Sequence, residues 1–231
     1  MKIIKNENLI KRNGRIGQYT SLGALGVLGI GMYLSFQRPD LFVVSIGALI
    51  AGFTMTQVGM YFSNRFGRSP RPDEQLDAAL KGLPGDITIY HYVTPVPHLL
   101  VGSAGLWIFQ IYHQRGKVTY YKNRWRLSGG GFMQAYMTVF GQEGLGNPSA
   151  EITNEIDQLK RYFVKHFGET EIPEINAVLV FSNEQAEIDN TDMPLPALKL
   201  KQIKDFIRQK AKEKSADFLT MEKLKGLLPS E

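Results

Sequence analysis

Histidines are the residues of this chain whose chemistry is easiest to recognise. Three of them, His91, His98 and His113, lie close together in the sequence. Imidazole nitrogens bind zinc, so the group invites comparison with a zinc site. None of the spacings HxH, HxxxH or HExxH occurs, and alternation along strands does not fix the three side chains on one face. We therefore predict partly buried strand histidines and no metal ligands.

A basic and aromatic segment, residues 117–127, offers binding chemistry instead. Its cations are the binding candidates Lys117, Lys122, Arg124 and Arg126, and they alternate with Tyr120, Tyr121 and Trp125. Such a mixture suits single-stranded nucleic acid, through phosphate contacts and base stacking. It equally suits a membrane interface, where Trp, Tyr, Lys and Arg gather. A plain hairpin also fits, with Trp125 on a packed face and exposed basic side chains on the other.

Residues 198–214 predict a second basic surface, on an amphipathic helix. We interpret its charged side as a solvated face. Contact with anionic lipid is the next alternative, and contact with nucleic acid the third.

The elements that position these residues begin with two uncharged stretches, residues 16–37 and 41–62, separated by Arg38-Pro39-Asp40. Each is long enough to cross a bilayer core, which takes roughly 20 helical residues. Pro39 favours a tight turn between them. The many glycines of the first stretch would weaken a helix in water but allow close packing in lipid, as do Ala48 and Gly52 in the second. We predict a transmembrane hairpin; a buried soluble hairpin is the alternative.

Basic residues flank both stretches and set the expected orientation. They are Lys2, Lys5, Lys11, Arg12 and Arg15 before the first, and Arg65, Arg68 and Arg71 after the second. The positive-inside rule puts both ends in the cytoplasm, so the protein is expected in the cell membrane with the bilayer as its first partner. Much of the formal net charge of +5 belongs to these flanks. The expected parts are a basic N-terminus (1–15), the hairpin (16–64), a linker (65–72) and a folded domain (73–231).

The folded domain shows a mixed pattern of helices and strands. Helices are predicted over residues 73–83, 149–167, 198–214 and 219–228. Strands are predicted over residues 87–93, 98–101, 106–112 and 177–181, with the hairpin 117–127 in addition. This order indicates an α/β domain with a central mixed sheet flanked by helices.

Residues 97–107 (PHLLVGSAGLW) resemble the core of nuclease-related (NERD) domains, where a strand and a glycine turn lead to a second strand and a turn such as Gly116-Lys117-Val118. Further residues and segments match the family in the same order along the chain: Glu74, Trp125, Asn147-Pro148, residues 177–182 (AVLVFS) and Leu219-Thr220. The resemblance extends over residues 73–228. It implies a restriction-endonuclease-like fold.

The resemblance also implies an active site, from which this chain departs. The family pattern resembles D…(E/Q)xK, whose acids hold a divalent metal that activates water. The matching positions here are Pro97, Gln110 and Tyr112. Proline supplies no ligand and tyrosine supplies no cation at neutral pH. An alignment shifted by one residue would put His98, again no carboxylate, at the Asp position. Glu151 stands where the family usually has Gln. We predict that the fold is retained and metal-dependent cleavage is lost.

Three functions follow, in order of preference. The first is a membrane-anchored, catalytically inactive NERD-like domain that binds or scaffolds at the cytoplasmic membrane face and needs no cofactor. The second is an accessory subunit that packs through its hairpin against a membrane protein partner. The third is a Mg²⁺-dependent nuclease with a rearranged site built on Glu74, Asp86 and Gln110. Nucleic acid stays open as a ligand.

Overall fold

A computed structural model describes residues 1–129, 144–167, 172–213 and 218–229. The chain forms two compact units. One is a helical unit, Glu7–Pro72, and the other is an α/β unit that combines Met1–Asn6 with Asp73–Glu231.

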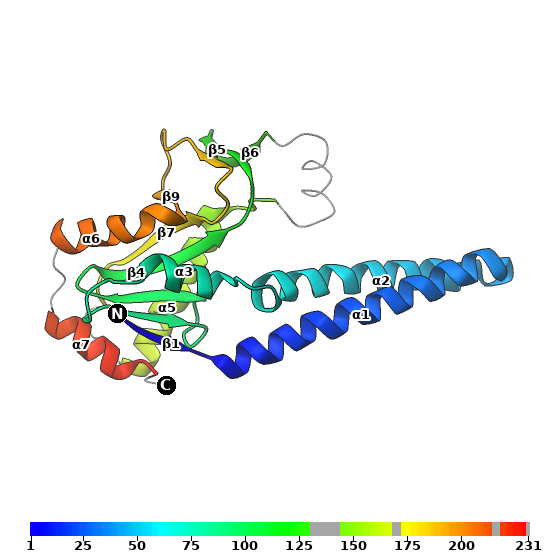
Figure 1. The fold of residues 1–231 in the computed structure, drawn as a ribbon, viewed down its shortest axis with the longest axis horizontal. Coiled ribbons are helices and arrows are strands. Elements are labelled where there is room, and N and C mark those ends of the chain that lie inside the picture. The colour runs from blue at the N-terminus through cyan, green and yellow to red at the C-terminus, as the bar shows by residue number, and fades with distance from the viewer. Residues whose placement is uncertain (130–143, 168–171, 214–217, 230–231) are drawn as a thin grey trace. The chain divides into compact units, whose positions relative to one another are not determined.

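The helical unit is a pair of helices, α1 (Glu7–Gln37) and α2 (Phe42–Phe62), joined by the short turn η1 (Pro39–Leu41) (Figure 1). A π-helical turn, η2 (Ser63–Gly67), follows α2. Small residues let the helices approach closely. A Cβ atom on Gly17 would lie 2.8 Å from the backbone nitrogen of Ser63, and the Ser45 hydroxyl donates to the Gly31 carbonyl at 2.7 Å.

Both long helices are apolar enough to cross a membrane. The most apolar part of α1 has a mean hydropathy of 1.3, that of the stretch containing α2 reaches 1.9, and 11% of the residues in each are buried. A core helix of a water-soluble protein would be mostly buried. Large apolar side chains face outward instead, among them Leu25, Ile30, Phe36, Val43 and Ile50. The two apolar helices were predicted, although α1 begins at Glu7 rather than at Ile16.

A six-stranded mixed sheet forms the centre of the α/β unit. Its order is β1 (Lys2–Lys5), β2 (Thr88–His91), β3 (His98–Gly102), β4 (Gly105–Tyr112), β7 (Ile175–Phe181) and β9 (Ala197–Lys199). Strand β3 is antiparallel to both of its neighbours, and the other adjacent pairs are parallel. Every strand except β3 therefore ends at the same side of the sheet, which we call the carboxyl edge.

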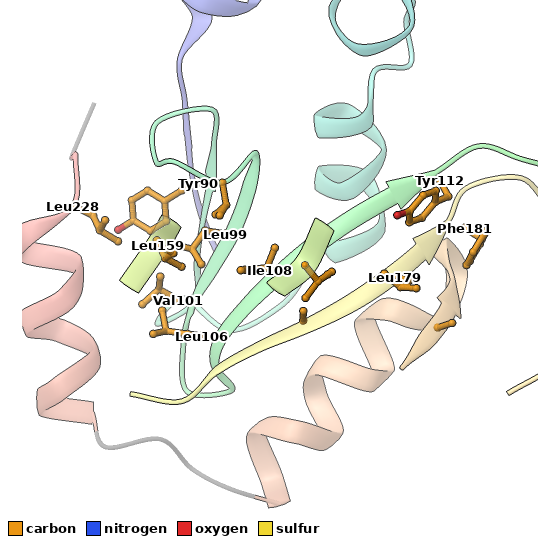
Figure 2. Packing of buried hydrophobic residues seen from close by; sticks show 14 of the residues in the cluster. Tyr90, Leu99, Val101, Leu106, Ile108, Tyr112, Leu159, Leu179, Phe181 and Leu228 are labelled. Carbon is orange, nitrogen blue, oxygen red and sulfur yellow. The ribbon is translucent and has the colours of Figure 1, made fainter. Parts of the chain in front are cut away.

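Helices cover both faces of this sheet, which confirms the α/β class. On one face, α3 (Pro72–Leu80) and α6 (Ile203–Glu213) pack through Leu76, Leu80, Ile203 and Ile207. On the other face lie α5 (Pro148–Phe167) and α7 (Phe218–Leu227). Figure 2 shows this second cluster, with Leu159 of α5 near Leu99 and Val101 of the sheet, and Leu228 near Tyr90.

A smaller, three-stranded sheet completes the α/β unit and contains the hairpin predicted over residues 117–127. Its order is β6 (Arg124–Ser128), β5 (Gly116–Tyr121) and β8 (Ala186–Ile188). The hairpin turns at Lys122 and Asn123, as predicted, and both residues have a positive φ.

Three local features differ from the sequence prediction. Strand β1 was not predicted, because Lys2 and Lys5 were interpreted as part of a membrane flank. The predicted helix over 198–214 begins instead as β9 and a short 3-10 turn, Leu200–Gln202. Helix α5 begins at Pro148 rather than at residue 149, and Asn147 caps it through Oδ1, which accepts a hydrogen bond from the Ala150 N–H at 3.3 Å.

Candidate functional site

Gln110, Tyr112 and Glu151 come together at the carboxyl edge. Gln110 and Tyr112 lie two residues apart on β4, so their side chains point to the same face, the one that α5 covers. The first turn of α5 carries Glu151. The Gln110 amide donates to Oε2 of Glu151 at 2.5 Å, and the Tyr112 hydroxyl donates to the same oxygen at 3.3 Å. One carboxylate oxygen therefore accepts hydrogen bonds from both side chains of β4.

The pKa of Tyr112 is raised well above its ordinary value. Burial is the largest cause, and the negative charges of Glu151 and Glu155 add to it. The ring is stacked on Phe181 with centroids 5.4 Å apart. The hydroxyl therefore stays protonated over the physiological pH range, where it donates a hydrogen bond but supplies no positive charge.

Pro97 lies just before β3, on the neighbouring strand. Strands β3 and β4 pair Leu99 with Ile108, and continuing this register sets Pro97 opposite Gln110. The Pro97 carbonyl accepts a hydrogen bond from the Tyr92 N–H at 2.9 Å. The three positions that were matched to the family pattern, Pro97, Gln110 and Tyr112, thus adjoin one another at the carboxyl edge.

The residues at these positions do not supply the metal ligands that the resemblance implies. Pro97 has no side-chain oxygen, Gln110 has no charge, and Oε2 of Glu151 is already engaged by two donors. Mg²⁺ favours carboxylate oxygens and nearly ideal octahedral geometry. Within the described part of the chain, no group of three or more His, Cys, Asp or Glu could hold a metal ion.

The acids of the rearranged nuclease site lie apart. Glu74 is on α3, which packs on the face opposite to α5. Asp86 lies beside the turn between β3 and β4, where Oδ2 accepts a hydrogen bond from the Ser103 N–H at 3.2 Å. Gln110 is near the other end of β4, about 20 Å from that turn at the usual rise of a strand. The structure does not bring these three residues together.

A row of polar side chains crosses three strands at the carboxyl edge, and sequence reasoning missed it. Lys5 pairs with His91, and His91 pairs with His98. Both histidines are buried, and their Nδ1 atoms are 2.8 Å apart. From α3, Asp77 lies 3.0 Å from Nε2 of His91 and also binds Lys5, and the fully buried Asp73 lies 3.1 Å from Lys5. We call these five residues the polar row.

The polar row is internally satisfied. One histidine Nδ1 donates to the other, so this contact holds one shared hydrogen. Burial lowers the pKa of Lys5, but the hydrogen bonds and charges of Asp77 and Asp73 outweigh it and hold the pKa above its ordinary 10.5. His91 and His98 lie on strands, as predicted, but they are buried rather than partly buried, whereas His113 follows β4 and is exposed. One feature of the sequence could have indicated the polar row: Asp73 and Asp77 are one helical turn apart and therefore lie on the same side of a helix.

The β5–β6 hairpin has one packed and one exposed face. Val118 and Trp125 are buried, and the indole N–H of Trp125 donates to Ser149 Oγ at 2.7 Å. The exposed face and the turn carry four cations and one aromatic ring: Lys117, Tyr121, Lys122, Arg124 and Arg126. The predictions that Trp125 is structural and that the basic side chains are exposed are confirmed.

Two open cavities lie elsewhere on the α/β unit. One of about 540 Å³ is at the base of the β5–β6 hairpin, where Arg115, Lys117 and Glu187 line it. The other, of about 550 Å³, lies between the loop 82–87 and α6, where Arg208 and Lys212 face Leu83. Gln110, Tyr112 and Glu151 line neither cavity.

Comparison with known proteins finds no family model, no curated protein and no solved structure that matches this chain.

Proposed function

We propose that this chain is a membrane-anchored, NERD-like domain that has lost nuclease chemistry and acts as a binding or scaffolding module at the cytoplasmic face of the cell membrane. One observation carries the proposal. At the carboxyl edge, Pro97 and Tyr112 stand where the family has an acid and a lysine. The neighbouring carboxylate, Glu151, is held by hydrogen bonds from Gln110 and Tyr112.

The topology supports a restriction-endonuclease-like fold for the α/β unit. A helix, three consecutive strands, a second helix and a further strand of the large sheet follow as α3, β2, β3, β4, α5 and β7, with the β5–β6 hairpin inserted between β4 and α5. The three consecutive strands form antiparallel neighbours, and β7 joins β4 in parallel. A domain of the NERD type would hold its active site where β3 begins and β4 ends, which is where Pro97, Gln110 and Tyr112 lie.

The charges around the helical unit support a cytoplasmic position for the α/β unit. The turn between α1 and α2 holds one Arg and one Asp, and Arg38 forms two hydrogen bonds of 3.0 Å with Asp40, which leaves the turn neutral. The cations gather at the other end, among them Lys11, Arg12, Arg65 and Arg68. This asymmetry favours a hairpin with both ends inside the cell.

The test uses the full chain in lipid nanodiscs, with labelled single- and double-stranded DNA and RNA. Mg²⁺, Mn²⁺ or a chelator is added, and cleavage is followed on gels. We expect no metal-dependent cleavage and the same result for Glu151→Gln. Cleavage that Glu151→Gln abolishes, and that Asp157→Asn on the same helix retains, would overturn the proposal. The full chain is needed because Met1–Asn6 contribute a strand to the α/β unit.

The accessory-subunit function is a second candidate. It is favoured by glycines that do not take part in the close packing of α1 against α2. A Cβ atom on Gly26, Gly29 or Gly47 would meet nothing within 4 Å. Such small residues allow another membrane helix to approach closely. A stoichiometric membrane protein that copurifies in mild detergent, and that is lost on Gly29→Leu, would support this function. A lone monomer would count against it.

A further inference from the structure

We propose that the exposed face of the β5–β6 hairpin docks on anionic phospholipid headgroups of the bilayer that holds α1 and α2. We call this face the basic face and define it by Lys117, Tyr121, Lys122, Arg124 and Arg126. The inference rests on the proposed function in one respect, namely that α1 and α2 anchor the chain in a membrane.

The charge of the basic face fits an anionic surface. Lys117 lies 3.4 Å from Asp189. Lys122, Arg124 and Arg126 form no ion pair with any residue that the structure describes, and all three are exposed. Clusters of Lys and Arg next to membrane helices are attracted to anionic headgroups, with each cation adding to the attraction.

Tyr121 gives the basic face an aromatic centre. Its side chain is 57% exposed, and Lys122 Nζ and the Arg126 guanidinium lie over its ring at 5.4 and 5.7 Å from the centroid. Tyrosine with flanking cations is a typical anchor at headgroup level. A surface for single-stranded nucleic acid would instead use several stacking rings in succession. The other hairpin rings, Tyr120 and Trp125, pack against each other 5.2 Å apart on the opposite face. One exposed ring among cations therefore favours lipid.

The hairpin and the membrane anchor arise from the same side of the α/β unit. Strand β4 ends at the carboxyl edge, and β5 follows it after three residues. Helix α1 follows β1 at the same edge, and the chain returns from α2 at the start of α3, where Asp73 contacts Lys5. Both helices of the proposed anchor are therefore joined covalently to the α/β unit at this edge. Contact of the basic face with lipid is thus an intramolecular event with a high effective concentration.

The experiment measures how close the basic face comes to lipid headgroups in the full chain. The chain has no cysteine, so Ser128→Cys, on the exposed face of β6, takes a single fluorophore. Lys165→Cys, exposed near the end of α5 at the opposite edge of the sheet, is the reference position. Nanodiscs contain lipid with a nitroxide on its headgroup, in a background either of zwitterionic lipid or with added phosphatidylglycerol. Recovery of protein in the discs checks anchoring independently of quenching.

We expect stronger quenching at Ser128→Cys than at Lys165→Cys in anionic discs, and a loss of this difference in zwitterionic discs or at high salt. Arg124→Gln with Arg126→Gln should weaken the contact equilibrium about 30-fold. The matched pair Lys160→Gln with Arg161→Gln, exposed on α5, should leave it unchanged.

Three results would overturn the inference. One is equal quenching at both positions in discs that hold the protein. Another is quenching that is insensitive to Arg124→Gln with Arg126→Gln. The third is tight, salt-sensitive binding of single-stranded RNA or DNA that those two substitutions abolish, which would assign the basic face to nucleic acid. Protein absent from the discs would instead contradict the anchor, and with it the proposed function.

Discussion

Lys5 forms ion pairs with two carboxylates, Asp73 and Asp77, at the end of β1, where the chain continues into α1. Asp73 is fully buried, and Asp77 also contacts His91. A buried carboxylate left without its cation is strongly unfavourable. Loss of this lysine should therefore destabilise the α/β unit more than loss of an exposed surface charge.

Replacing Lys5 by methionine should lower the free energy of unfolding by about 3 kcal/mol, because Asp73 loses the cation that it faces. The matched control is Lys2→Met, an exposed lysine of the same strand, which should change stability by less than about 0.5 kcal/mol. Thermal unfolding in mild detergent measures both. Equal midpoints for the two variants would show that the ion pairs of the polar row contribute nothing.

The same lysine should give the protein an alkaline stability limit. The pKa of Lys5 is raised above 10.5 in the folded state, so its contribution is present below that pH and is lost as the pH rises further. The difference in unfolding midpoint between the native chain and Lys5→Met should therefore shrink as the pH rises above 10.5. The Lys2→Met variant is measured in parallel as the reference for other effects of high pH on stability, because it loses a lysine of the same strand but keeps Lys5. A constant difference over this range would contradict the assignment.

At the scale of elements, close helix packing in the hairpin depends on individual glycines. A methyl group at Gly17 would meet the Ser63 backbone nitrogen at 2.8 Å, whereas one at Gly26 of the same helix meets nothing. Gly17→Ala should destabilise the helix pair by about 1–3 kcal/mol through overpacking. Gly26→Ala should be neutral or slightly stabilising, because Ala favours a helix. The two variants are titrated with SDS, and the unfolding of the α1–α2 pair is followed by circular dichroism. A more stable Gly17→Ala than Gly26→Ala would contradict the close approach of α1 to Ser63.

The elements that the sequence predicted are those with a strong local pattern. The apolar helices, the four core strands, the basic hairpin and α5 all have their own periodicity or turn signal. Strand β1 has none, since it is four residues long and two of them are lysines. The pairing of His91 with His98 and the approach of Glu151 to Gln110 depend on strand register and on the path of α5, which no local pattern encodes. The candidate positions Pro97, Gln110 and Tyr112 were found through a family resemblance, and the acid beside them, Glu151, was noticed only as a departure from it.

At the scale of the whole molecule, the α/β unit is made from both ends of the chain. Replacing Glu7–Pro72 by a short Gly-Ser linker should give a soluble, folded domain, because Lys5 and Asp73 lie 3.1 Å apart at the joining point. Removing Met1–Asn6 as well should cause aggregation, since β2 becomes an unprotected edge and Asp73 loses its ion pair with Lys5. Size-exclusion chromatography and thermal unfolding compare the two chains. Equal solubility and stability would mean that β1 is dispensable.

The orientation of the hairpin can be tested on intact cells, again because the native chain has no cysteine. Asp40→Cys in the turn between the helices should react with a membrane-impermeant maleimide from outside. Lys165→Cys in the α/β unit should react only after the membrane is permeabilised. The opposite pattern would place the α/β unit outside the cell and contradict the positive-inside orientation.

The place of β1 in the chain also bears on how the protein is made. This strand is synthesised before both apolar helices, but its partner β2 is synthesised only after them. In the membrane-anchored arrangement proposed above, the sheet can be completed only when β1 and β2 are on the same side of the bilayer, which requires an even number of crossings. A chain in which one helix failed to insert would carry β1 and β2 in different compartments. Completion of the sheet thus acts as a check that the hairpin has been inserted correctly.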